Sequence, residues 1–265
     1  MRLLQLIGVL LDYPQDDLWQ HAGELRQAAA DPALLADLPA RLSHASRAEI
    51  GVQLRAFVET LLASDPLEAQ ARWVASFDQG RAMSLLLFEH IHGESRERGQ
   101  AMADLLETYR ASGYRLTARE LPDYLPLLLE YLAQQPEDQA RDWLRHLSAI
   151  LALLAARAAE RELPYAPLLA LLTDLADLDQ PTPDPARHAT LRRRAHDEPR
   201  DDTPEAIDRV WEEEAVRFGA SMGAGTGAGA SSAPSSPDAG CAAISPAPAR
   251  RYPSTIAIHP EEAAR

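Results

Sequence analysis

Residues 77–100, FDQGRAMSLLLFEHIHGESRERGQ, pass within a few positions from an apolar run to a dense cluster of ionisable groups. From Met83 to Phe88 the apolar side chains would cover every side of a helix, as in a central helix enclosed by its neighbours. Gly93 suits the left-handed residue that ends a helix. The stretch therefore predicts a buried central helix whose polar end presents a binding site.

Outward from this stretch, the chain up to about Ala176 has the composition of helices. It is rich in Leu, Ala, Glu, Arg and Gln, and it lacks the alternating Val, Ile and Thr of strands. Asp65-Pro66 is a typical helix start, because Asp65 can accept from free backbone donors and proline fits the first position. Apolar spacing and such signals predict helices over about residues 3–11, 16–30, 46–62, 66–77, 83–93, 95–113, 121–132, 137–160, 168–175 and 203–218.

The predicted fold is all-α, an antiparallel helical bundle with a separate C-terminal helix and a disordered tail. Composition divides the chain into four parts. They are a helical domain (1–178), a charged, Pro-rich linker (179–202), an amphipathic C-terminal helix (203–218) and a low-complexity tail (219–265).

The net charge of −14 excludes some classes of function. An acidic protein repels a phosphate backbone, so we expect no nucleic-acid partner, and a basic partner is favoured instead. The Arg192–Arg194 run is read as solvated or as docked on the acidic body.

Compartment is predicted from cysteine use and hydropathy. Cys241 is the single cysteine, so no internal disulfide framework can form, and a reducing compartment is expected. The apolar segment Leu3–Leu11 is short and precedes Asp12-Tyr13-Pro14, which indicates a buried first helix and no signal peptide. No segment approaches the roughly 20 apolar residues that cross a bilayer. We expect a cytoplasmic protein, at most peripheral to a membrane.

The first candidate site is the cluster around His90, His92 and Glu94. His90 and Glu94 are four residues apart on one helical face and could share a metal, which gives the alternative reading of a metal-dependent helical enzyme. A polar helix end that is hydrogen-bonded to its neighbours is a second reading. A peptide-recognition surface is the third and is favoured by Arg96 and Arg98, since cations in a first helical turn oppose the helix dipole.

The second candidate site is Glu120-Leu121-Pro122-Asp123-Tyr124. Asp123 could cap the helix that follows it. Glu120 and Asp123 also offer two carboxylates beside the hydroxyl and aromatic ring of Tyr124, which suit a cationic peptide. The sequence has no nucleophile elbow near Ser84, so we predict no catalytic residue, no metal ligand and no cofactor of its own.

Several motifs resemble the NarJ-type assembly chaperones of respiratory nitrate reductase, also called its delta subunit, within the wider family of molybdoenzyme maturation chaperones. The motifs are FDxGRAxSLLLFEHxHGESRxRGQAM (residues 77–102), RELPDYLPL (119–127), LEYLAQ (129–134) and DDTPxAxDxVWEEE (201–214). The resemblance covers most of residues 1–218. The wider family has a Pro-Asp-His motif that matches 122–124, where Tyr124 replaces the histidine.

The resemblance implies a chaperone that binds the N-terminal segment of the apo catalytic alpha subunit of nitrate reductase in the cytoplasm. It would hold that subunit for insertion of the molybdenum cofactor and for membrane assembly, with cofactor-delivery proteins as further candidate partners. We expect the bound segment to be basic and helical, given the acidic, Leu-rich bundle. The predicted peptide-binding residues are Phe77, Arg81, Glu89, His90, His92, Glu94, Arg96, Glu120, Pro122, Asp123 and Tyr124.

Overall fold

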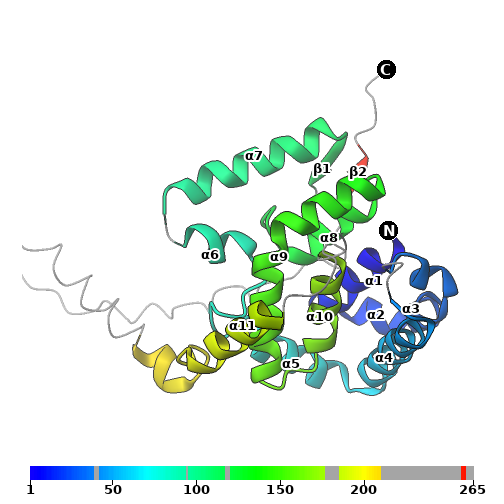
Figure 1. The fold of residues 1–265 in the computed structure, drawn as a ribbon, viewed down its shortest axis with the longest axis horizontal. Coiled ribbons are helices and arrows are strands. Elements are labelled where there is room, and N and C mark those ends of the chain that lie inside the picture. Colours follow the sequence, from blue (N-terminus) through cyan, green and yellow to red (C-terminus); the bar gives the residue numbers. More distant parts are fainter. Residues whose placement is uncertain (39–41, 94, 117–119, 177–184, 210–257, 261–265) are drawn as a thin grey trace, which may run out of the picture. The chain divides into compact units, whose positions relative to one another are not determined.

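Helices make up most of the structure, a computed structural model that describes residues 1–38, 42–93, 95–116, 120–176, 185–209 and 258–260. The helices in chain order are α1 (Arg2–Leu11), α2 (Asp16–Gln20), α3 (Ala22–Ala30), the 3-10 helix η1 (Pro32–Ala36), α4 (His44–Ala63), α5 (Pro66–Phe77), α6 (Leu87–His92), α7 (Glu97–Ala111), α8 (Leu125–Ala133), α9 (Glu137–Glu160), α10 (Ala166–Ala176) and α11 (Pro185–Asp197). The prediction of an all-α fold is confirmed (Figure 1).

The chain divides into two compact units. The first contains Met1–Asp202 together with Pro253–Arg265, and the second contains Thr203–Tyr252. In the second unit the structure describes 203–209, and residues 204–209 are helical. The rest of the helix predicted over 203–218 lies outside the described residues, as does the predicted tail apart from 258–260.

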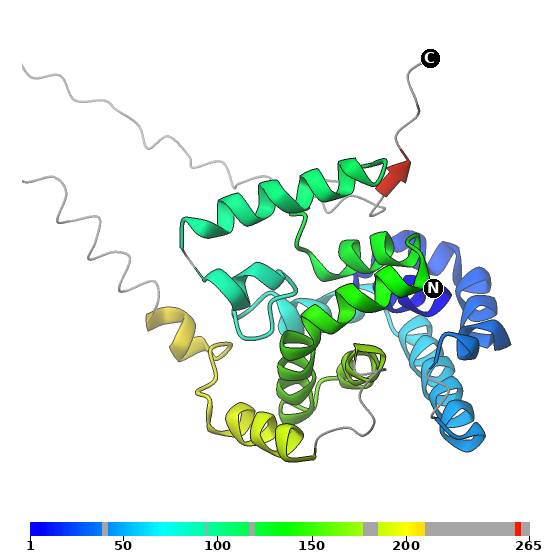
Figure 2. The ribbon, with the colours of Figure 1, turned by 45° about the horizontal axis from the view of Figure 1, so that its top comes forward.

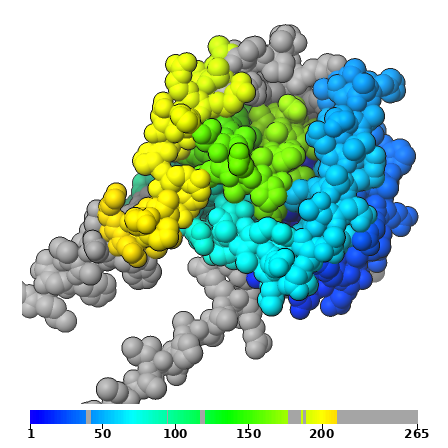
Figure 3. Space-filling model, turned by 90° about the horizontal axis from the view of Figure 1, so that it is seen from below, coloured from blue at the N-terminus to red at the C-terminus, as the bar shows by residue number. Residues whose placement is uncertain are grey.

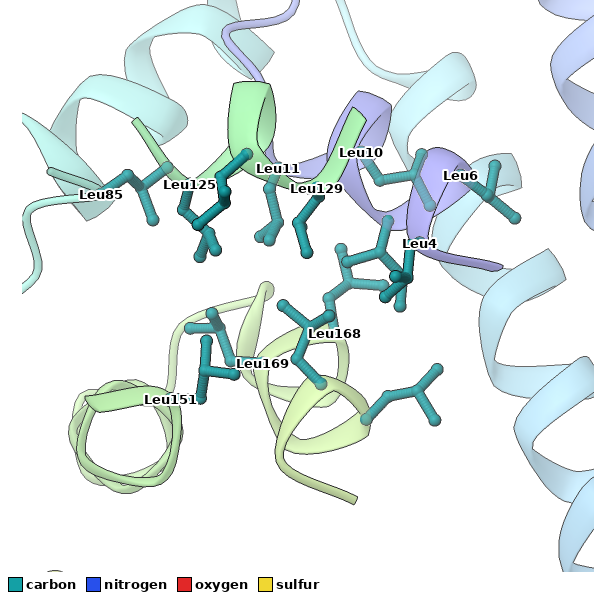
Figure 4. Packing of buried hydrophobic residues seen from close by; sticks show 14 of the residues in the cluster. Leu4, Leu6, Leu10, Leu11, Leu85, Leu125, Leu129, Leu151, Leu168 and Leu169 are labelled. Carbon is teal, nitrogen blue, oxygen red and sulfur yellow. The ribbon is translucent and has the colours of Figure 1, made fainter. Parts of the chain in front are cut away.

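Leucine side chains from α1, α8, α9 and α10 form the centre of the first unit (Figure 4). Leu4 of α1, Leu125 of α8 and Leu169 of α10 are all fully buried. Burying one such side chain contributes about 1.5–3 kcal/mol, so this contact holds the bundle together. Gly8 lets α1 approach α8 closely, since a Cβ at this position would lie 3.2 Å from the carbonyl oxygen of Pro126.

Local signals fixed several helix ends as predicted. The Asp65 side chain accepts from the backbone N–H of Leu67 at 2.9 Å and caps α5, with Pro66 in the first position. α9 runs over the predicted range, Glu137–Glu160. Pro126 is the second residue of α8, where a missing N–H costs nothing. The helix predicted over 46–62 is α4, which begins two residues earlier, at His44, because Ser43 caps it.

The central helix differs from the prediction, since residues 83–86 are not helical and α6 begins only at Leu87. The backbone there pairs with the 123–125 segment instead. Leu86 forms an antiparallel bridge with Tyr124, and the N–H of Leu125 donates to the carbonyl of Leu85 at 2.8 Å. Met83, Leu85 and Leu87 are buried as expected, so the run is central but mostly not a helix.

Two further helix boundaries differ from the sequence prediction. The helix predicted over 16–30 is interrupted at His21, whose backbone lies between α2 and α3. The helix predicted over 95–113 is α7, which begins only at Glu97 with Arg96 as its N-cap residue and without a side-chain hydrogen bond from that residue.

The predicted linker over 179–202 is replaced in part by α11, which packs against α9. Ala195 is buried in this contact, and Glu198 pairs with Arg157. α11 has few apolar residues and no clear apolar face, so the sequence did not predict that this helix packs against α9. Residues 179–184 lie outside the part of the chain that the structure describes.

A short antiparallel pair joins β1 (Tyr114–Leu116) to β2 (Ile258–Pro260), with Arg115 opposite His259. Figures 1 and 2 show α1–α4 at one end of the first unit and α6 and α11 at the other. Among the helices described, none combines the length and apolar character that spanning a bilayer requires.

Candidate functional site

A groove with a volume of about 630 Å³ opens between α1, the α2–α3 pair and the start of α8. This volume lies within the range of about 300–1,000 Å³ usual for ligand sites. Its apolar lining includes Leu6, Val9, Leu18, Leu25, Ala28 and Leu34. Leu6 and Val9 are three residues apart on one face of α1, and Val9 is 45% exposed. The groove therefore offers an accessible apolar floor.

Carboxylates surround this floor. Those that line the groove are Asp12, Asp17, Glu24, Asp31 and Glu130. Arg2 is the one arginine or lysine among the lining residues, all of which are described, and it pairs with Asp31 at 2.6 Å. The groove is therefore acidic at its edge and apolar at its base, a combination that suits a cationic amphipathic ligand.

Asp12 is the most perturbed of these carboxylates. Burial raises its pKa to about 7, and the nearby charges of Glu120 and Asp17 add to the rise. A hydrogen bond of 2.9 Å from the Tyr124 hydroxyl opposes the rise in pKa, because it favours the ionised form. Asp12 is therefore a groove carboxylate that changes charge near neutral pH.

The predicted residue Asp123 has an internal role in this structure. Its side chain is fully buried, and one carboxylate oxygen accepts from the N–H of Phe88 at 2.9 Å while its backbone carbonyl accepts from Leu87. Asp123 thus caps α6, and not the helix that follows it. The other oxygen, Oδ1, is buried and has no hydrogen-bond partner within the described structure, and burial raises the pKa of this carboxyl.

The side chains of the predicted histidines also contact other residues of the first unit. His90 Nε2 lies 2.8 Å from the carbonyl oxygen of Ser84, and burial lowers the pKa of the imidazole. His92 stacks edge-on against Phe88 and lies 3.9 Å from Glu97. Glu94, the third member of the predicted cluster, is outside the described residues.

No group of three or more His, Cys, Asp or Glu residues in the described ranges could hold a metal ion. Of the charged neighbours, Glu89 pairs with Arg98 at 3.2 Å. The polar end of α6 is therefore a hydrogen-bonded helix terminus in this structure.

The remaining predicted residues range from buried to exposed. Phe77 is buried against the rings of Trp73 and Tyr165, and the carbonyl of Pro122 accepts from the Tyr109 hydroxyl at 2.7 Å. Arg81 and Arg96 are exposed, and Glu120 is half-buried. Contact of all these residues with a peptide stays a prediction.

The structure places the segment that leads into the first predicted cluster against the second cluster, since residues 85–88 are hydrogen-bonded to 123–125. None of the predicted residues lines the groove, although Tyr124 reaches Asp12 in its wall. Sequence reasoning missed the groove because it treated the first helix as wholly buried. The recurrence of carboxylates at 12, 17, 24 and 31 beside short apolar helices was the signal available.

Comparison with known proteins gives consistent matches. The family model described as nitrate reductase delta subunit matches residues 43–170. The nitrate reductase molybdenum cofactor assembly chaperone NarJ of Escherichia coli K12 is 48% identical over 226 residues, which cover 84% of this chain and 87% of that protein. The probable chaperone NarW of the same strain is 42% identical, with 82% and 84% covered. A probable NarJ of Bacillus subtilis is 32% identical, with 63% and 83% covered.

Proposed function

This chain belongs to the nitrate reductase delta subunit family, and we propose that, like its relative NarJ, it is a chaperone of nitrate reductase assembly and not an enzyme. We propose further that it binds the N-terminal segment of the apo catalytic alpha subunit. It would hold that subunit for insertion of the molybdenum cofactor and for membrane assembly. The proposed site of action is the cytoplasm, and cofactor-delivery proteins are proposed as further partners.

The groove beside α1 is the observation that carries this proposal. An amphipathic helix commonly binds by laying its apolar face into such a groove. Val9, Leu18 and Leu25 would receive the apolar face, and the carboxylates around them would meet basic residues. Acidic edges would also speed encounter with a basic segment at low ionic strength.

The metal-dependent enzyme is the less supported reading. Its ligands would be His90, His92 and Glu94, and the first of these is already hydrogen-bonded to a backbone carbonyl. NarJ and NarW of Escherichia coli, which match 84% and 82% of this chain, carry chaperone names.

Calorimetry with a synthetic peptide of the alpha-subunit N-terminus tests the groove. Val9→Arg places a cation on the floor, and it should weaken binding by about tenfold or more, since charge and lost apolar contact both oppose the peptide. Val52→Arg is the matched control, because Val52 is an exposed valine (51%) in α4 outside the groove. Equal affinities for the two variants would refute the groove assignment.

A further inference from the structure

Two arginines at the C-terminal end of α9, Arg157 within the helix and Arg161 at its C-cap, hold the chain segment Glu198–Asp202. Arg157 and Arg161 are four residues apart, and the side chain of each is only 6% exposed. Arg157 binds Glu198 with both arms of its guanidinium, Nε to Oε2 and Nη2 to Oε1, each at 2.6 Å. Such a bidentate pair fixes direction as well as distance. Figure 3 shows α11 (yellow), which leads into this segment, lying against α9 (green).

The second arginine holds the end of the same segment. Arg161 pairs with two carboxylates: its Nη2 lies 3.1 Å from Oδ1 of Asp201, and its Nη1 lies 3.3 Å from Oδ2 of Asp202. Asp202 also pairs with Arg200 at 2.7 Å, which keeps the segment compact. Residues 198–202 are therefore bound to α9 through three carboxylates.

The backbone carbonyl and N–H of Ala82 are hydrogen-bonded to residues of the same ion pairs. Its carbonyl accepts from Arg157 at 2.7 Å, and its N–H donates to Asp201 at 2.7 Å. Ala82 lies in the turn before α6, in the stretch whose backbone carbonyl at Ser84 meets His90. The contacts of residues 198–202 thus extend to the turn that leads into α6.

Gly80 leaves room for this close approach. A Cβ at position 80 would lie 2.7 Å from the Asp201 carboxylate, so that carboxylate would have to move away from its present position. The backbone of Gly80 does not have a positive φ, so alanine could adopt its conformation. The steric conflict in a Gly80→Ala variant would therefore fall on the contact with Asp201.

Polar contacts, and not apolar burial, hold the segment in place. In Glu198–Asp202 the one apolar residue is Pro199, which is exposed. Glu198 and Asp201 are 29% and 34% exposed, whereas their arginine partners are buried. A segment with few apolar contacts can open locally while a leucine core stays closed. Thr203, the next residue, begins the second compact unit.

We propose that Glu198–Asp202 is a releasable latch, which fixes the point where the chain leaves the first unit and holds the turn at Gly80–Ala82. Opening of the latch separates residues 198–202 from Arg157 and Arg161 and loosens the turn, while the helical bundle remains folded. This proposal does not depend on the client peptide. It therefore stands or falls separately from the groove.

Hydrogen exchange measured by mass spectrometry on the full chain tests the latch. In Gly80→Ala and in Asp201→Asn, peptides that contain Ala82 or residues 198–202 should exchange about tenfold faster, while peptides from α1 and α8 stay as in the wild type. Gly99→Ala is the matched control, because Gly99 lies in α7 with nothing within 4 Å of its added Cβ.

The double variant Gly80→Ala/Asp201→Asn separates a shared contact from two independent defects. Both changes act on one contact, so the double variant should exchange no faster than the quicker single variant. Unchanged exchange at Ala82 in both single variants would overturn the latch. Faster exchange throughout the bundle would overturn it as well, because the segment would then be part of the global core.

Discussion

The hydroxyl of Tyr124 donates a 2.9 Å hydrogen bond to the carboxylate of Asp12, which lies 112 residues earlier in the chain. This bond connects two parts of the molecule that sequence analysis treated separately. Tyr124 follows the buried Asp123 in the turn before α8, and Asp12 is in the wall of the acidic groove. Tyr124, a member of the second predicted cluster, therefore contacts a residue that lines the groove.

Removal of this hydroxyl should change the titration of Asp12. In Tyr124→Phe the ionised carboxylate loses a donor, so the pKa of Asp12 should rise further above its value of about 7. The lost bond should also lower stability by about 0.5–1.5 kcal/mol. Carbon-detected NMR titration of the aspartate carboxyls measures the pKa. Tyr114→Phe is the control, since that ring packs on Tyr131 and not on Asp12. An unchanged pKa in Tyr124→Phe would contradict the assignment.

Asp12 should make the free energy of unfolding fall as pH rises. Its pKa is 3.8 in the unfolded reference and about 7 in the fold, so between these values the folded state binds the extra proton. Stability should therefore decrease from about pH 4 to about pH 7, by up to about 1.4 kcal/mol per pH unit from this group. Urea unfolding at several pH values should show a flatter profile for Asp12→Asn. Parallel profiles for variant and wild type would show that Asp12 does not titrate in this range.

Salt should weaken peptide binding through the groove carboxylates. Asp17→Asn removes one half-buried charge from the groove and should reduce affinity about two- to fivefold in low salt, in line with the small energies of ion pairs near the surface. The difference should shrink at high ionic strength because salt screens exposed charges. Asp138→Asn in α9 is the control, being exposed and outside the groove. A peptide affinity that is indifferent to salt would count against an electrostatic role.

Asp123 and Glu120 should behave differently on substitution. Asp123→Ala removes the acceptor of the Phe88 N–H and should lower the free energy of unfolding by about 1–3 kcal/mol, with faster hydrogen exchange in α6.

Glu120→Gln should leave stability nearly unchanged, as Glu120 is only half-buried. Peptide calorimetry on Glu120→Gln then tests its predicted place in the binding site. Full affinity would remove Glu120 from that site.

Features that depend on neighbouring residues could be predicted from the sequence. The Asp65 cap, the extent of α9 and the place of Pro126 in the first turn of α8 follow from contacts within about one helical turn. The burial of Met83, Leu85 and Leu87 also followed from their apolar character. Their helical conformation did not, because backbone pairing with residues 123–125 replaced the helix.

The amino-acid sequence by itself determined an all-α chain, its family and the acidic, Leu-rich character of its surface and core. Tertiary structure alone decided where a ligand could bind. The groove, the Asp12–Tyr124 bond and the Arg157–Glu198 pair join residues far apart in the chain, the last two across 112 and 41 positions. Periodicity and capping report only on residues within a few positions of each other, so contacts over such separations become visible only when the helices have packed.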